Sequence, residues 1–206
     1  MPETLHASEV NSKTDPSVAK QYDNETPKDQ QIQQFFEIAD GLKICMLNTY
    51  RNGVGPVGRS MAVAKRNGPD FLFLANKDST KFSDLDQNKE VQISFQDAKS
   101  SQNWISISGT ATTTSNSDPR IKDVWSRATG AWFGDLGDGK HTGGPEDPRM
   151  TLIEVKSKYV TYYQTDVGLL GMAKEVIGAA ATGGVANTGK IRELSEQDLE
   201  KSRSKQ

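Results

Sequence analysis

Short connections between strand-like segments constrain the fold of this chain more than any other feature of its sequence. Segments that alternate apolar and polar residues, rich in β-branched and aromatic side chains, follow one another from residue 42 onward. Several are separated by only about two to five residues, whereas a parallel pair of strands needs a crossover of roughly a dozen or more. Glycine-containing turns at 51–55 and 67–70 mark two of these connections. The pattern therefore predicts a small barrel of mostly antiparallel strands.

Six strands with peripheral helices are expected, which makes the fold mostly β and of the α+β class. In 90–97, for example, Val91, Ile93 and Phe95 alternate with polar residues and are expected to face the core. The predicted strands are 42–50, 57–66, 71–76, 90–97, 103–115 and 150–165.

Three helices are expected around the barrel. Thr26 is a suitable N-cap and Pro27 a suitable first residue for a helix that Gly41 ends. A short helical pattern follows at 78–88 and another at 118–133, the second before a loop rich in glycine and proline.

Composition divides the chain into a folded centre and two polar ends. Residues 1–25 have no apolar period and are expected to form a disordered tail. Residues 26–166 contain all the predicted strands and form the predicted barrel domain. Residues 167–206 are expected to be a C-terminal tail that is partly helical, with a helix at 169–180. The stretch 168–186 contains two charged residues and five glycines, so it is not expected to span a membrane.

Charge and residue counts exclude several classes of function. The net charge of −2 provides no basic excess, so no nucleic-acid partner is expected. The single cysteine, Cys45, cannot form an intrachain disulfide, and its apolar neighbours predict a buried thiol. The two histidines, His6 and His141, lie in separate polar segments, which argues against a zinc site and a Ser-His-Asp triad. The first residues lack the features of a signal peptide, so a cytoplasmic location is expected.

A polar cluster follows the apolar strand 71–76 and suggests an anion site. The expected N-cap, Asp78 or Ser79, begins a helix whose first backbone N–H groups have no acceptor within the helix. Ser79 and Thr80 add hydroxyl groups, and Lys81 adds a positive charge.

Arg59 can join this cluster if strands 57–66 and 71–76 form a hairpin through the short turn between them. Its guanidinium offers paired N–H groups that suit a phosphate. The residues alone leave two interpretations open. Either the cluster binds a phosphate group, or Ser79 only caps the helix while Lys81 and Arg59 are surface charges.

Five short motifs occur in an order and at spacings that resemble a known family. In this chain they are Arg59-Ser60-Met61-Ala62, Ser79-Thr80-Lys81, Ser108-Gly109-Thr110-Ala111, Ala131-Trp132-Phe133 and Tyr159–Tyr163. Together they resemble the FMN-binding split barrel of the pyridoxamine 5′-phosphate oxidase-like superfamily. Within it, the chain is most similar to the general stress protein group, which includes fungal blue-light-inducible proteins. The resemblance covers about residues 28 to 165 and implies a six-stranded antiparallel split β-barrel.

The resemblance also implies an FMN cofactor and a homodimer with the flavin at the subunit interface. Ser79, Thr80 and Lys81 would hold the phosphate. Arg59 and the backbone of residues 60–62 would lie along the ribityl phosphate and the edge of the flavin.

Other residues are implied on the ring side of the flavin. Ala75 and Asn76 would approach the ring or the ribityl chain. Trp104 would lie at the dimer-related side, and Trp132 near the isoalloxazine ring. The implied cofactor-binding residues are therefore Arg59, Ser60, Met61, Ala62, Ala75, Asn76, Ser79, Thr80, Lys81, Trp104 and Trp132.

Departures from the family limit the activity that is expected. Pyridoxamine phosphate oxidases proper carry Arg-Lys after the serine, where this chain has Thr80-Lys81. Their C-terminal substrate-binding Arg and His motif has no counterpart in 191–206. Pyridoxine phosphate oxidation is therefore not expected. No side chain stands out as a general base, so the catalytic residues stay unassigned and the flavin would supply any chemistry.

Three functions fit these features. The first is an FMN-dependent oxidoreductase of the general stress protein type, and the second is a non-catalytic flavin carrier or sensor in a stress or light response. The third is a small-barrel binding module such as an oligonucleotide-binding fold, against which the scattered basic residues and the acidic loop 134–140 argue. Related barrels also hold a deazaflavin or haem, and the shortage of histidines makes haem the weaker alternative.

Overall fold

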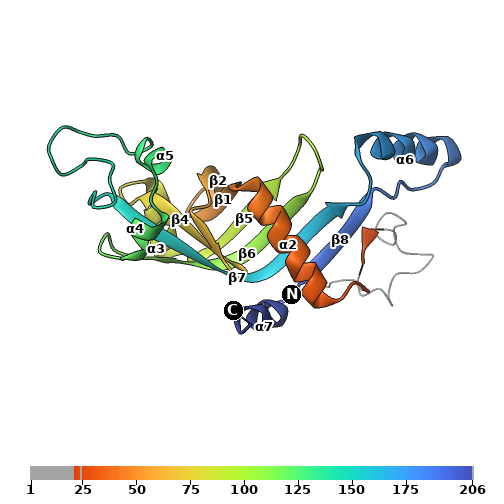
Figure 1. The fold of residues 1–206 in the computed structure, drawn as a ribbon, viewed down its shortest axis with the longest axis horizontal. Coiled ribbons are helices and arrows are strands. Elements are labelled where there is room, and N and C mark those ends of the chain that lie inside the picture. The colour runs from red at the N-terminus through yellow and green to blue at the C-terminus, as the bar shows by residue number, and fades with distance from the viewer. Residues whose placement is uncertain (1–20, 24, 206) are drawn as a thin grey trace.

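The computed structural model describes residues 21–23 and 25–205. Within them it contains eight strands and six helices (Figure 1). Of the disordered tail expected at 1–25, residues 1–20 and 24 lie outside the described residues. The strands are β1 (Ile44–Arg51), β2 (Gly55–Ala62), β3 (Lys65–Asn67), β4 (Asp70–Asn76), β5 (Glu90–Gln96), β6 (Trp104–Thr113), β7 (Met150–Thr165) and β8 (Gly189–Leu194). The helices are α2 (Lys28–Leu42), α3 (Thr80–Gln87), α4 (Arg120–Val124), α5 (Arg127–Gly130), α6 (Leu169–Thr182) and α7 (Glu196–Arg203).

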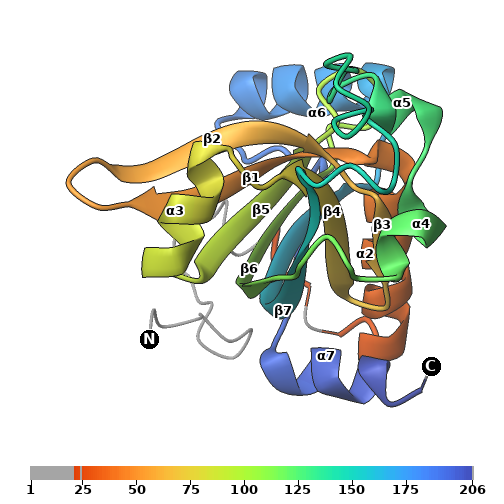
Figure 2. The same ribbon diagram turned by 90° about the vertical axis from the view of Figure 1, so that its left-hand side faces the viewer.

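The sheet closes into a barrel because one bent segment serves both of its edges (Figure 2). The strand order is β2-β1-β5-β6-β7-β4-β3, and every pairing between named strands is antiparallel. Only Val63 and Ala64 separate β2 from β3, and the Ala64 N–H donates to Leu72 O at 2.8 Å, beside the β3–β4 pair. The strand at one end of the order thus continues directly into the strand at the other end.

The predicted fold class, a mostly β barrel with peripheral helices, is confirmed, although the strand count differs. The segment predicted as one strand, 57–66, forms most of β2 and the first two residues of β3. The long strand predicted at 150–165 has those bounds. The additional strand β8 pairs only with the end of β7, so six strands remain in the barrel when β2 and β3 count as one.

Helix α2 packs its apolar face on the barrel and links it to an aromatic cluster. Phe35 is fully buried, and its ring centroid lies 6.3 Å from that of Phe71. Phe71 lies in turn 5.7 Å from Phe95 of β5. Such tilted ring pairs stabilise a core beyond the burial of their area.

Both ends of α2 differ from the prediction. The N-cap is Pro27, and the Thr26 hydroxyl donates to Asp23 Oδ2 at 2.6 Å instead of capping the helix. Gly41 lies inside the helix, and Lys43 takes the left-handed conformation that follows it, with φ of 53°.

The helix predicted at 118–133 is interrupted. Trp125 has an extended backbone after α4, and its indole Nε1 donates to Gly143 O at 3.0 Å. Ser126 then caps α5 by accepting a hydrogen bond from the Thr129 N–H. The indole contact with the following loop and the serine cap together stop one helix and start another.

The C-terminal segment is more ordered than the sequence suggests. Helix α6 forms close to its predicted bounds, but β8 and α7 replace the expected polar tail. Leu194 and Leu199 are fully buried in the main core, and Arg203 Nη2 lies 2.5 Å from Asp70 Oδ1. Figure 1 shows α6 at one end of the molecule, far from α5. None of the described helices is long and apolar enough to cross a membrane.

The described part of the N-terminal segment also contacts the sheet. Tyr22 forms a parallel bridge with Ile191 of β8. Asp23 Oδ2 lies 2.9 Å from Arg192 Nη2, and the Arg192 side chain is only 7% exposed. Residues 21–23 are therefore not part of a solvated tail, contrary to the expectation for 1–25.

Candidate functional site

The first turn of α3 gathers hydroxyl groups and a lysine at the end of β4. The Ser79 hydroxyl donates to Asn76 O at 2.6 Å, and Lys81 Nζ donates to Ser79 Oγ at 2.6 Å. Ser79 is the N-cap residue, one of the two predicted, but its side chain accepts no hydrogen bond from the helix backbone. The N–H groups of Thr80 and Lys81 donate to no acceptor among the described residues. The turn therefore presents hydrogen-bond donors and a positive charge to an anion.

Arg59 reaches this turn from β2 through a buried carboxylate. Asp84 lies on α3, and its side chain is 3% exposed. Arg59 Nη2 lies 3.3 Å from Asp84 Oδ2, and Arg59 Nη1 donates to Thr49 Oγ1 at 2.8 Å. The Thr49 hydroxyl donates to Asp84 Oδ2 at 2.8 Å. These contacts hold the Arg59 guanidinium between the barrel and α3.

A second arginine, Arg51 at the end of β1, contacts the same carboxylate. Arg51 Nε lies 2.9 Å from Asp84 Oδ1, and Arg51 Nη2 lies 3.2 Å from Asp84 Oδ2. Arg51 Nη2 also donates to Thr80 Oγ1 at 3.2 Å. We call Arg51, Arg59, Lys81 and Asp84 the cationic cluster. Figure 2 shows α3 beside β1 and β2. These two strands carry Arg51 and Arg59, the arginines of the cationic cluster.

The charges in the cationic cluster act on one another. The hydrogen bond from Arg51 lowers the pKa of Asp84, and Thr49 and the two guanidinium charges lower it further, although burial opposes them. Burial, and then the positive charge of Arg59, lowers the pKa of Lys81. Burial also lowers the pKa of Arg59. Two cations thus lie close enough to repel each other, and a bound anion would relieve that repulsion.

Arg59 lies near the first turn of α3, as predicted, but the strand pairing that brings it there differs from the prediction. Within the segment 57–66, only the part in β3 pairs with β4, whereas the part in β2 pairs with β1, where Arg59 lies opposite Leu47. The expected hairpin of 57–66 with 71–76 is therefore limited to its last residues. Arg59 reaches α3 through its contact with Asp84 rather than along a hairpin.

Sequence reasoning missed three members of this arrangement. The sequence placed Thr49 in the strand 42–50, Arg51 in the turn 51–55 and Asp84 in the helix 78–88, without a role in the site for any of them. One signal was present: Asp84 precedes the buried Leu85 and lies one helical turn after Lys81, on the side where α3 meets the barrel.

An open groove of about 380 Å³ lies on the outer face of β1, β2, β5 and β6. Two predicted residues, Ser60 and Trp104, line it, and the Trp104 ring stacks on Tyr163 with centroids 6.3 Å apart. Ile44, which also lines the groove, is 62% exposed. Ser60 and Arg59 lie on opposite faces of β2, so the groove and the cationic cluster are on different sides of the sheet. The remaining groove residues are Cys45, Met46, Ser94, Phe95, Gln96, Ile105 and Ser106.

The other predicted residues are spread over the fold. Met61 packs against the main core, and Ala75 is buried in it, whereas Ala62 is exposed. The Asn76 side chain accepts a hydrogen bond from the Asp78 N–H at 2.9 Å. Trp132 is 89% exposed just after α5 and does not line the groove.

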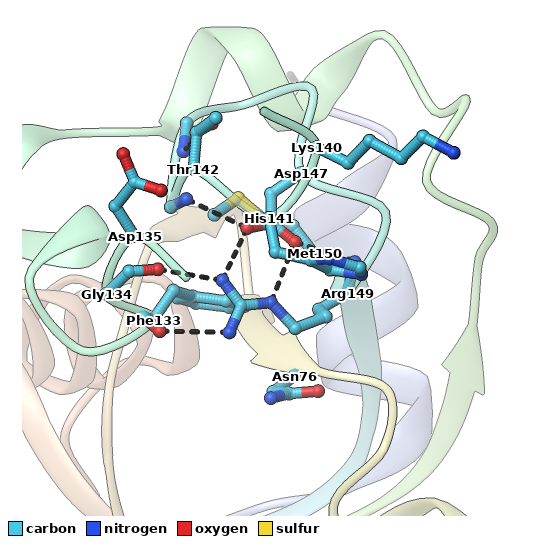
Figure 3. A network of polar contacts seen from close by, with 12 residues as sticks. Asn76, Phe133, Gly134, Asp135, Lys140, His141, Thr142, Asp147, Arg149 and Met150 are labelled. Carbon is cyan, nitrogen blue, oxygen red and sulfur yellow. Dashed lines mark hydrogen bonds and ion pairs between the residues drawn. The ribbon is translucent and has the colours of Figure 1, made fainter. Parts of the chain in front are cut away.

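A buried ion pair fixes the loop that follows Trp132 (Figure 3). Arg149 Nη2 lies 2.6 Å from Asp147 Oδ2 and 2.8 Å from Gly134 O, and Arg149 Nη1 lies 3.0 Å from Phe133 O. The hydrogen bond from Arg149 lowers the pKa of Asp147 despite its burial. The backbone just after Trp132 is therefore held by Arg149, through the carbonyl oxygens of Phe133 and Gly134.

A family model described as pyridoxamine 5′-phosphate oxidase like matches residues 30–187. Among curated proteins, Protein bli-3 of Neurospora crassa is 36% identical over 197 residues, which are 94% of this chain and 93% of that protein.

Solved structures share the fold at low sequence identity. A general stress protein 26 from Jannaschia is 18% identical, with a TM-score of 0.61 over 81% of this chain and 99% of that one. A pyridoxamine 5′-phosphate oxidase-related, FMN binding protein from Nostoc punctiforme is 13% identical, with a TM-score of 0.52 over 69% of this chain and 87% of that one.

Proposed function

The chain belongs to the pyridoxamine 5′-phosphate oxidase like family, and on that premise we propose that it binds FMN and acts as a flavin-dependent oxidoreductase of the general stress protein type. The observation that carries the proposal is the convergence of Ser79, Lys81 and Arg59 at the start of α3. The FMN-binding protein from Nostoc, which has the same fold, supports the choice of flavin.

The donor set at α3 fits a phosphate monoester. Hydroxyl groups of Ser79 and Thr80, the backbone N–H groups of the first helical turn, and the charges of Lys81 and Arg59 are the groups that bind phosphate in proteins. These residues would hold the phosphate and so fix the register of the flavin on the barrel. The bound flavin would supply the electron transfer.

The ring side of the site remains a proposal from the family resemblance. Ser60 and Trp104 share the outer groove, while Met61, Ala62, Ala75, Asn76 and Trp132 lie elsewhere. A homodimer would bring groups from a second copy to the same flavin, and the exposed Ile44 and Met46 offer apolar surface for such a contact. A cytoplasmic location belongs to the same proposal.

A flavin carrier or sensor without turnover is the alternative. It is favoured by the lack of a free acid or base among the described residues of the cationic cluster, because its only carboxylate, Asp84, is tied to two arginines. Stopped-flow absorbance after mixing the FMN-loaded protein with NADPH or NADH separates the two functions. Reduction faster than that of free FMN supports the oxidoreductase, and reduction at the free rate supports the carrier.

The binding proposal itself is tested by desalting the protein after mixing it with FMN and recording its absorbance. About one flavin per chain is expected. The double variant Ser79→Ala, Lys81→Ala should weaken FMN binding by about 2–4 kcal/mol, through loss of charge-assisted bonds to the phosphate. Lys77→Ala is the matched control, since Lys77 is an exposed lysine just before the same turn. Equal affinities for the double variant and the control would show that the phosphate binds elsewhere.

A further inference from the structure

A buried carboxylate beside a phosphate site demands an explanation, because its negative charge repels the ligand. Asp84 is 3% exposed and lies three residues after Lys81 on α3. It accepts hydrogen bonds from Arg51, Arg59 and Thr49. Its contacts therefore link α3 to β1 and β2.

The two arginines approach Asp84 in ways that leave other N–H groups available. Arg51 uses Nε and Nη2, and Arg59 uses Nη1 and Nη2. Arg51 Nη1 and Arg59 Nε donate to no acceptor among the described residues. The Arg51 side chain is 38% exposed and that of Arg59 is 21% exposed. Asp84 thus holds both guanidiniums in place while part of each stays accessible.

The charges of the cationic cluster match one class of ligand. Its three cations and one carboxylate leave a net charge of +2. A phosphate monoester carries about −1.5 to −2 at neutral pH. Arg51 also contacts the Thr80 hydroxyl, which belongs to the helix turn proposed for the phosphate.

We propose that Arg51 binds the phosphate together with Arg59 and Lys81, and that Asp84 is the positioning residue that sets the two guanidiniums for a dianionic phosphate monoester. The inference rests on the proposed FMN binding and assigns two residues to it that neither the motifs nor the family resemblance indicated. A guanidinium that is already ordered loses less side-chain entropy when the phosphate binds.

The direction in which Asp84→Asn changes FMN affinity distinguishes a positioning role from simple repulsion of the phosphate. If Asp84 only repels the phosphate, Asp84→Asn removes that repulsion and tightens FMN binding. If Asp84 positions the arginines, the same change lets them move apart and weakens FMN binding. Riboflavin, which lacks the phosphate, should be insensitive to the change in either case.

The experiment is a titration of flavin fluorescence with FMN and, separately, with riboflavin. Asp84→Asn and Arg51→Gln should each weaken FMN binding about 10- to 100-fold, the range for losing a charge-assisted bond. Riboflavin affinity should stay within about threefold. Because Asp84 acts through Arg51, the double variant should cost much less than the product of the two single effects. Arg127→Gln, at an exposed arginine on α5, is the control and should leave FMN binding unchanged.

Each outcome decides one statement. Tighter or unchanged FMN binding by Asp84→Asn overturns the positioning role, and unchanged binding by Arg51→Gln overturns the role of Arg51 in the site. If Asp84→Asn fails to fold, Arg51→Gln decides alone, since the Arg51 side chain is partly exposed. Wild-type protein that binds riboflavin as tightly as FMN overturns the inference but keeps flavin binding. Wild-type protein that binds neither overturns the proposed function as well.

Discussion

Replacing Leu199 by alanine tests whether α7 is part of the folded core. Leu199 is fully buried in the main core cluster, on a helix that packs against β7, β8 and α2. The substitution removes three carbon atoms, worth about 2.4 kcal/mol at roughly 0.8 kcal/mol for each buried group. The cavity left behind adds to this, so we expect a loss of about 3 kcal/mol or more in the free energy of unfolding.

The measurement is urea unfolding of the wild type and the variant, supported by thermal melts. A loss of about 3 kcal/mol corresponds to a fall in Tm of about 6–12 °C for a chain of this size. Leu170→Ala is a matched control on α6, the preceding helix in the chain, where Leu170 is 85% exposed. It should change stability by less than about 0.5 kcal/mol. If both variants lose the same small amount, α7 is not packed as described and the C-terminal segment is a tail after all.

Two further predictions concern single residues. Asp23 should make the free energy of unfolding depend on pH. Burial raises the pKa of Asp23, but hydrogen bonds from Thr26 and Glu25 and the charge of Arg192 outweigh burial. The pKa is therefore about 2, below the ordinary 3.8. The stabilisation from Asp23 is therefore present above about pH 4 and is lost as the pH falls toward 2, by at most about 2 kcal/mol, since one pKa unit corresponds to about 1.4 kcal/mol; Asp23→Asn should remove this difference in urea unfolding at pH 2 and pH 5. Gly109→Ala should cost about 1–3 kcal/mol in a thermal melt, because a Cβ there lies 2.5 Å from Lys156 O. Gly178→Ala, in α6 with nothing within 4 Å, should instead stabilise by up to about 1 kcal/mol, and a Gly109 variant that behaves in the same way would contradict the close approach.

The barrel was predictable because its signals are local. Alternation along 90–97 and 103–115 and short turns between strands leave few ways to arrange the sheet, and β5, β6 and β7 formed close to the expected bounds. The bend that divides 57–66 into β2 and β3 was not predictable, because it depends on which partners each half finds across the closed barrel.

The C-terminal elements were missed although one signal was available. Ser195 and Asp198 form a reciprocal capping box at the start of α7, and that pattern just before Leu199 indicates a helix start. The short strand β8 carries Lys190, Arg192 and Glu193 among its six residues, so its composition resembles a solvated segment. Its place in the sheet depends on pairing with β7, which no local pattern reports.

The candidate site was predictable in part for a similar reason. Ser79 and Lys81 are neighbours in sequence, so their association at a helix start follows from local chemistry. Arg51 and Asp84 are 33 positions apart, and only the closure of the barrel against α3 brings them together. Whether Trp132 and Trp104 serve one flavin stays a prediction, since within a single copy they lie in different places.

The core of this protein is completed only after residues 189–203 have been synthesised. Arg203 bonds to Asp70 across 133 positions, and Leu194 and Leu199 complete a core whose other buried side chains lie between Ile32 and Tyr162. Contacts between residues so distant in sequence slow folding, because a long loop must close before they form. Until residues 189–203 have left the ribosome, the apolar surfaces of β7 and α2 that they cover remain in water. During that interval the incomplete core is exposed to association with other chains, so a released chain truncated near residue 190 would be prone to aggregate.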